Sequence, residues 1–259
     1  MVDDRVRPRT SAATSLRTAA VWATLSALAR DRSTELGRPL RVLDLGGGTG
    51  GTAVPLAEAG HDVTVVDPSP DALAALRRRA AETDTSERVH AQQGDTDSVG
   101  DLLVGGEHPA YDIVCLHGLL EVVDDPEPAL TNVTAVLAPG GVLSLVVAQR
   151  LAAALARAVA GDFGGARAVL ERPDGRAGEN DPLPRRFDED AVLALLQLHG
   201  FQILDTHGVR IFSDLVPSAL VDSESARLDL LALEEVASHS SRHPLLTALG
   251  ANLHVLARR

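Results

Sequence analysis

A carboxylate followed by a run of glycines is the first group of residues in this chain whose types and spacing could do chemistry. The carboxylate is Asp44, and the glycine-rich run behind it ends at Gly51. Glycine lets the backbone turn tightly and lets a ligand approach the main chain closely. A second carboxylate, Asp67, ends the next apolar segment of the chain. These residues predict a ligand site built on a tight turn.

Two ligand classes compete for this turn. Gly46, Gly48 and Gly51 match the G-x-G-x-x-G pattern of dinucleotide sites, which also require an acid about 20 residues further on. The D-x-G-x-G-x-G pattern associated with S-adenosylmethionine (SAM) is matched by Asp44, Gly46, Gly48 and Gly50. A carboxylate here would repel a pyrophosphate but attract the ammonium and sulfonium groups of SAM. The sequence therefore favours SAM, with an NAD-dependent oxidoreductase as the alternative.

Further polar residues stand where other apolar segments end. Asp67 could accept hydrogen bonds from both ribose hydroxyls, or could cap the following helix. Asp95 and Thr96 could bind the adenine edge, or could only cap a loop. His117 could contact the cofactor, or could be a hydrogen-bonded histidine of the core.

Short apolar segments alternate with helical patterns around these residues. Strands are predicted at 40–45, 62–67, 89–93, 111–117 and 142–147, and helices at 52–59, 69–82 and 126–137, with Ser69 as an N-cap and a turn at 139–141. This alternation predicts an α/β fold with a parallel sheet and helices on both faces. Ligands of such sheets bind beyond the carboxyl ends of the strands, where the polar residues stand.

The pattern changes after residue 147. Helices are predicted at 151–160, 188–199 and 223–238, strands at 201–212 and 251–257, and a long loop at 161–186. Loops of that length are usually functional or disordered. We expect one domain, with a disordered tip (1–14), N-terminal helices (15–39), a cofactor-binding core (40–147) and a substrate-side part (148–259).

Composition excludes several function classes. The 259 residues contain no lysine, which excludes a Walker-type phosphate loop and a Schiff-base lysine. The net charge of −12 gives no bulk attraction to nucleic acid. The single cysteine, Cys115, excludes a disulfide and a cysteine-built metal site, and we predict no metal. No segment is apolar enough to span a bilayer, so we predict a cytoplasmic protein with no membrane partner.

These motifs resemble those of the class I SAM-dependent methyltransferases. The resemblance covers 40–147 and includes DIVCLHGLLEVVDDPEPAL (112–130) and LAPGGVLSL (137–145). It implies a Rossmann-like fold with a mostly parallel seven-stranded sheet, an antiparallel final strand, an N-terminal helical cap and helical inserts near the cleft. SAM is the implied cofactor.

A closer resemblance reaches from about residue 15 to the end of the chain. VAGDF (159–163), DPLPRRFD (181–188) and GFQILDTHGVRIFSD (200–214) are similar to the bacterial tRNA 5-carboxymethoxyuridine methyltransferase family, which acts on the wobble uridine of the anticodon. The resemblance implies that Arg17 reaches the SAM carboxylate. It implies that the cofactor is lined by Gly46, Gly47, Asp67, Asp95, Thr96 and His117. The chain departs from the family where an aromatic residue and an Asn are replaced by Ala148 and Gln149, which weakens a prediction of base stacking.

A carboxylate acceptor would already be ionised at neutral pH and would need no general base. It would need a cation to hold it in register, and Arg binds a planar carboxylate through two hydrogen bonds. The candidates are Arg150, Arg185, Arg186 and Arg210.

Other acceptors remain open. A hydroxyl or amine acceptor would need a base. The nearest polar candidates are His117, Gln149 and His207, and we assign none of them. Three readings stay open beside tRNA: a small carboxylate metabolite enclosed by the 161–186 loop and 213–249, a non-catalytic SAM-binding module, and the oxidoreductase.

Overall fold

The computed structural model describes residues 19–96, 99, 110–238 and 243–259, and its described part is built on one seven-stranded sheet. The strands lie in the order β3-β2-β1-β4-β5-β7-β6. Their bounds are β1 Arg41–Leu45, β2 Asp62–Asp67, β3 Val89–Gln93, β4 Tyr111–His117, β5 Leu137–Ala148, β6 Gln202–Val209 and β7 Asn252–Arg258. β1 to β5 pair in parallel, and β7 is antiparallel to both β5 and β6. The expected fold class, including the antiparallel final strand, is confirmed.

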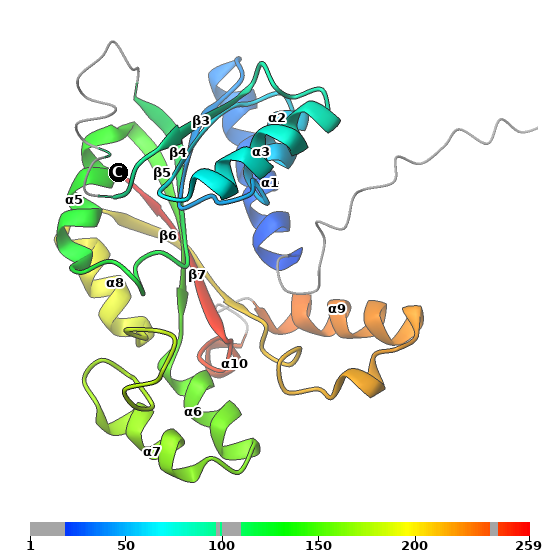
Figure 1. Cartoon of the computed structure of the whole chain (residues 1–259), viewed down its shortest axis with the longest axis vertical. Helices are drawn as coiled ribbons and strands as arrows, with labels where there is room; N and C mark the ends of the chain where they lie inside the picture. Colours follow the sequence, from blue (N-terminus) through cyan, green and yellow to red (C-terminus); the bar gives the residue numbers. More distant parts are fainter. Residues whose placement is uncertain (1–18, 97–98, 100–109, 239–242) are drawn as a thin grey trace, which may run out of the picture.

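Helices cover both faces of this sheet (Figure 1). Their bounds are α1 Ala19–Leu36, α2 Ala53–Glu58, α3 Pro70–Glu82, α5 Pro126–Val136, α6 Arg150–Val159, α7 Phe163–Glu171, α8 Glu189–Leu198, α9 Glu224–Ser238 and α10 Pro244–Thr247, with a short 3₁₀ helix, η1, at Ser218–Leu220. α1, α2 and α3 pack on one face, and α5 and α8 on the other. None of the described helices is long and apolar enough to cross a membrane.

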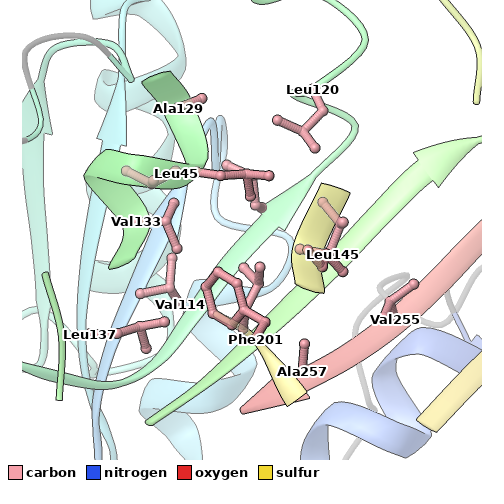
Figure 2. Close-up of a cluster of buried hydrophobic side chains, with 14 of the residues drawn as sticks. Leu45, Val114, Leu120, Ala129, Val133, Leu137, Leu145, Phe201, Val255 and Ala257 are labelled. Atoms are coloured by element: carbon pink, nitrogen blue, oxygen red, sulfur yellow. The ribbon is translucent and has the colours of Figure 1, made fainter. Parts of the chain in front are cut away.

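The core on the α5 side of the sheet explains why the central strands are continuous apolar runs in the sequence. Leu45, Val114 and Leu145 come from three adjacent strands and meet Val133 of α5 and Phe201 in one buried cluster (Figure 2). Strands covered on both faces have no solvent side, so they show no alternation of polar residues. This packing fixes the edge of the sheet where β1, β2 and β4 end.

The predicted loop at 161–186 is wrong in its first half, where α7 forms. Asp162 caps this helix and accepts a hydrogen bond from Gly165 N at 2.9 Å. Ala166 and Val169 are buried on one face of α7, which packs against α6. The glycines at 164 and 165 hid this signal because glycine disfavours helix interiors.

The chain after α7 has no helix or strand up to α8 but is held by ion pairs. Arg186 binds both oxygens of Asp181, at 2.8 and 2.9 Å, and the Asp181 side chain is fully buried. The Arg186 hydrogen bonds hold the pKa of Asp181 well below its usual range. This segment is an ordered part of the fold.

Smaller differences concern element ends. The strand predicted at 201–212 ends at Val209, because Arg210 takes a left-handed conformation (φ 60°) that breaks the extended run. The turn predicted at 139–141 lies inside β5, and α10 and η1 were not predicted. Ser69 is confirmed as the N-cap of α3, accepting from Ala72 N at 3.2 Å. The expectations for 1–14 and for Arg17 lie outside the described residues.

Candidate active site

The glycine turn follows β1 and needs glycine for two physical reasons. Gly46, Gly48 and Gly50 have positive φ angles of 69°, 56° and 81°, a region that other residues rarely adopt. A side chain at Gly47 would bring its Cβ within 2.5 Å of Asp44 Oδ2. The turn therefore leaves its main chain bare toward the space beyond β1.

Asp67 ties this turn to the end of β2. Its Oδ2 accepts a hydrogen bond from Gly48 N at 2.9 Å, and its Oδ1 accepts one from Ser69 N at 2.9 Å. The side chain is buried, and each carboxylate oxygen can accept more than one hydrogen bond. The carboxylate thus holds the turn while keeping acceptor capacity for a ribose hydroxyl.

Asp44 lies beneath the turn. The residue is 2% exposed, and its Oδ2 has no hydrogen-bond partner. Burial, with a smaller contribution from the charge of Asp67, raises the pKa of Asp44 to about 7. We expected a cation beside this carboxylate; Asp44 lies against Gly47 and is not among the residues that line the cavity described next.

A cavity of about 260 Å³, here called the cofactor-side cavity, opens beyond the ends of β1, β2 and β3. It is lined by Leu45, Gly46, Val66, Pro68, Gly94, Asp95, Thr96, Leu119, Val122, Val123 and Asp124. Three of the predicted cofactor residues, Gly46, Asp95 and Thr96, are brought together here. The segment 119–124 was missed, because apolar lining residues carry no sequence signature of their own. The bare turn, the carboxylate at the end of β2 and this adjoining cavity fit SAM.

His117 ends β4, is half-buried, and begins a polar row that crosses the sheet. Its Nε2 lies 2.8 Å from Ser144 Oγ, which lies 2.9 Å from His254 Nε2. His254 in turn lies beside His207, with ring centroids 5.8 Å apart. Burial lowers the pKa of His117 to about 4 and holds that of His254 well below its usual value, so both rings are neutral at pH 7.

A second cavity of about 250 Å³, here called the acceptor-side cavity, lies where β5 ends and β7 begins. Its walls are Ala148, Gln149, Ala152, Ala153, Leu155, Ala156, Leu183, Arg186, Arg210, Ile211, Asp214, Leu215, Leu249, Ala251 and Asn252. Arg210 forms an ion pair with Asp214, and its Nη1 lies 3.5 Å from Asn252 Oδ1. Arg186 also reaches the wall but is held by Asp181.

The other two predicted arginines point elsewhere. Arg150 donates to the carbonyls of Arg172 and Pro173 and lies 3.1 Å from Asp188. Arg185 donates to the carbonyl of Asp124, on the rim of the cofactor-side cavity. Of the four candidates, Arg210 lies on the acceptor-side wall and pairs there with the carboxylate of Asp214, an exposed residue, and with the side-chain amide of Asn252.

Glu121 is a buried carboxylate that the sequence analysis missed. The residue is 2% exposed, its Oε1 accepts from Ala148 N at 2.6 Å, and its Oε2 has no hydrogen-bond partner. Burial raises the pKa of Glu121. Its neighbours Leu119 and Val122 line the cofactor-side cavity, and Ala148 lines the acceptor-side cavity, so Glu121 joins the two. A single Glu after two apolar residues is typical of a surface position, so the sequence contained no signal for it.

Among the described residues, no group of three or more His, Cys, Asp or Glu side chains is placed to hold a metal ion.

Comparison with known proteins places this chain. A methyltransferase domain family matches residues 43–143. The tRNA 5-carboxymethoxyuridine methyltransferase of Escherichia coli K12 is 32% identical over 244 residues, covering 94% of this chain and 88% of that protein. Among solved structures, a SAM-dependent methyltransferase from Mesorhizobium loti has a TM-score of 0.60 at 20% identity, covering 95% of this chain and all of that one. Magnesium protoporphyrin IX methyltransferase from Synechocystis, with bound SAH, has a TM-score of 0.58 at 16% identity, and the match covers 100% of this chain and 90% of that one.

Fold and site together define a class I SAM-dependent methyltransferase, which uses SAM as methyl donor. Within that class, the chain belongs to the family of its Escherichia coli relative. The nicotinamide-dependent alternative is thereby set aside.

Proposed function

We propose that this enzyme transfers the methyl group of SAM to the carboxylate of 5-carboxymethoxyuridine at the tRNA wobble position, forming a methyl ester. The observation that carries the proposal is Arg210 on the wall of the acceptor-side cavity. Similarity to the Escherichia coli relative supports it, because that similarity extends over 94% of the chain and so includes the substrate-side part. A tRNA substrate would place the activity in the cytoplasm.

Methyl transfer requires the protein mainly to align the methyl donor with the acceptor. Displacement at an activated methyl carbon is in line, so donor and acceptor must be held at a fixed distance and angle. The acceptor carboxylate is already ionised, so no side chain has to remove a proton. Asp67, the glycine turn and the cofactor-side cavity would hold SAM.

Arg210 would hold the acceptor. Its Nε and one terminal nitrogen face Asp214, while Nη1 lies toward Asn252. A guanidinium has five N–H donors in a planar fork, so Nη1 keeps donor capacity for an incoming carboxylate. Gln149 also lines this cavity, but its Nε2 is used by the carbonyls of Thr247 and Gly250.

A small carboxylate metabolite is the second candidate. The acceptor-side cavity measures about 250 Å³ and is lined largely by Ala and Leu, which suits a small, partly apolar molecule. Ala148 offers no aromatic face for a base, and the net charge of −12 gives no general attraction to RNA. Both candidates share a carboxylate held by Arg210.

Mass spectrometry of tRNA nucleosides from a deletion strain tests the choice. Loss of the methyl ester on the wobble uridine, restored by the wild-type protein but not by an Asp67→Ala variant, would support the tRNA substrate. An unchanged nucleoside profile would refute it and favour a metabolite. Purified protein with SAM and tRNA from the deletion strain should then regenerate the ester in vitro.

A further inference from the structure

Arg210 has an unfavourable backbone conformation that its surroundings must enforce. Asp84 and Arg210 are the non-glycine residues with positive φ in the described part of the chain. Non-glycine residues in this region are strained and persist only where neighbouring groups hold them. One such group is the amide of Ala251, which donates a hydrogen bond to the Arg210 carbonyl at 3.2 Å.

The amides that follow Arg210 are held by one buried carboxylate from α9. Glu234 accepts hydrogen bonds from Ile211 N at 2.9 Å, Phe212 N at 2.9 Å and Ser213 N at 2.7 Å. The Ser213 hydroxyl donates a fourth bond at 2.5 Å. Successive N–H groups beside a left-handed residue form a concave site for an anion, and hydrogen bonds to a carboxylate are among the strong ones.

Glu234 lies behind Arg210 as seen from the acceptor-side cavity. A third cavity of about 360 Å³ lies between α1 and α9, and both Arg210 and Glu234 line it. Arg210 lines the acceptor-side cavity as well, whereas Glu234 does not. Arg210 is therefore a wall between the two spaces, and Glu234 supports that wall from the α9 side.

We propose that Glu234 is a positioning residue for Arg210: by binding the three amides after Arg210, it fixes the left-handed backbone that aims the guanidinium into the acceptor-side cavity. The inference rests on the proposed role of Arg210 as the acceptor-binding cation. The Glu234 side chain does not line the acceptor-side cavity and contacts its wall through the main-chain amide of Ile211. We therefore expect its effect on the reaction to pass through the backbone that carries Arg210.

A double-mutant cycle separates this role from simple stabilisation. The variants are Glu234→Gln, Arg210→Ala and the double variant, with Glu235→Gln as the matched control, since Glu235 is the exposed neighbour on the same helix. The probes are SAM, by calorimetry, and tRNA from the deletion strain, by initial rates. We expect Glu234→Gln to lower kcat/KM for tRNA about tenfold, which corresponds to the loss of one charged hydrogen bond. The SAM affinity of this variant should be unchanged, and Glu235→Gln should have the kcat/KM of the wild type.

The decisive result is the double variant. If Glu234 acts through Arg210, adding Glu234→Gln to Arg210→Ala costs nothing further, because the group it positions is gone. An additive loss would overturn the inference and leave Arg210 as the acceptor-binding residue. A normal Arg210→Ala enzyme would overturn the proposed function of Arg210 together with the inference.

A milder variant covers the case in which Glu234→Gln does not fold. Ser213→Ala removes one of the four hydrogen bonds and keeps the three amides in place. We expect a loss of about threefold in kcat/KM, near the lower limit for one hydrogen bond, and this loss should also vanish in the Arg210→Ala background. Persistence of the loss there would overturn the inference.

Discussion

Asp44 combines a buried carboxylate, an oxygen without a partner and a pKa raised to about 7, and this combination makes the replacement Asp44→Asn informative. A carboxyl group whose pKa is higher in the folded protein favours the neutral form there. Its contribution to stability is fully present below the unfolded pKa of 3.8 and is lost as pH rises through 7.

The magnitude follows from the size of the shift. A rise from 3.8 to about 7 is about three pKa units, and each unit corresponds to about 1.4 kcal/mol. The ligand-free protein should therefore lose about 4 kcal/mol between pH 4 and pH 8.5 because of this one group. Asn carries no charge, so the Asp44→Asn protein should escape that loss.

Urea unfolding at pH 4 and pH 8.5 measures the effect. We expect Asp44→Asn to be more stable than the wild type at pH 8.5, by up to about 4 kcal/mol, with the difference shrinking toward pH 4. Other titrating groups are common to both proteins and cancel. Glu87→Gln, which removes an exposed charge, is the control and should change little.

The same variant tests why the charge is kept. If the carboxylate serves the cationic groups of SAM through the thin glycine turn, Asp44→Asn should bind SAM more weakly in calorimetry at pH 8.5. Equal stability of the two proteins at pH 8.5 would refute the electrostatic reasoning. Unchanged SAM affinity would refute the link between Asp44 and the cofactor.

Three further outcomes are expected. Asp67→Ala should weaken SAM binding severely, and wild-type affinity in calorimetry would contradict the assignment. Because two hydrogen bonds to backbone amides are also lost, the variant should be less stable by about 1–3 kcal/mol but should still fold. Arg210→Ala should spare SAM binding and reduce turnover on the acceptor about 100-fold, the loss of a charged hydrogen bond to the acceptor carboxylate. Unaffected turnover would refute the proposed role of Arg210. The pKa of His117 is lowered to about 4, so the unfolded chain binds a proton at this ring between pH 6.5 and pH 4 while the folded protein does not. The free energy of unfolding should therefore fall by about 3 kcal/mol over that pH range. His117→Gln should flatten that part of the urea-unfolding profile, and parallel profiles would argue against a neutral ring.

The sequence by itself determined the sheet and the glycine turn that follows its first strand. The bounds of β2 and β4 were predicted to the residue, because strands buried on both faces are continuous apolar runs between turn residues. Ser69 as a helix cap and the glycines at 46, 48 and 50 were likewise readable, since each depends on the conformation of a few adjacent residues. These signals act over a short range and survive in a linear sequence.

Tertiary structure alone decided which side chains line the two cavities. Arg150, Arg185 and Arg210 looked alike in sequence, yet Arg185 reaches a carbonyl 61 residues away, while the amide that follows Arg210 is bound by a carboxylate on α9. The helix α7 formed against local glycine preferences because its buried face packs on α6. The direction of a long side chain and the formation of a weak helix both depend on partners that are distant along the chain. The spacing of residues in the sequence does not identify those partners.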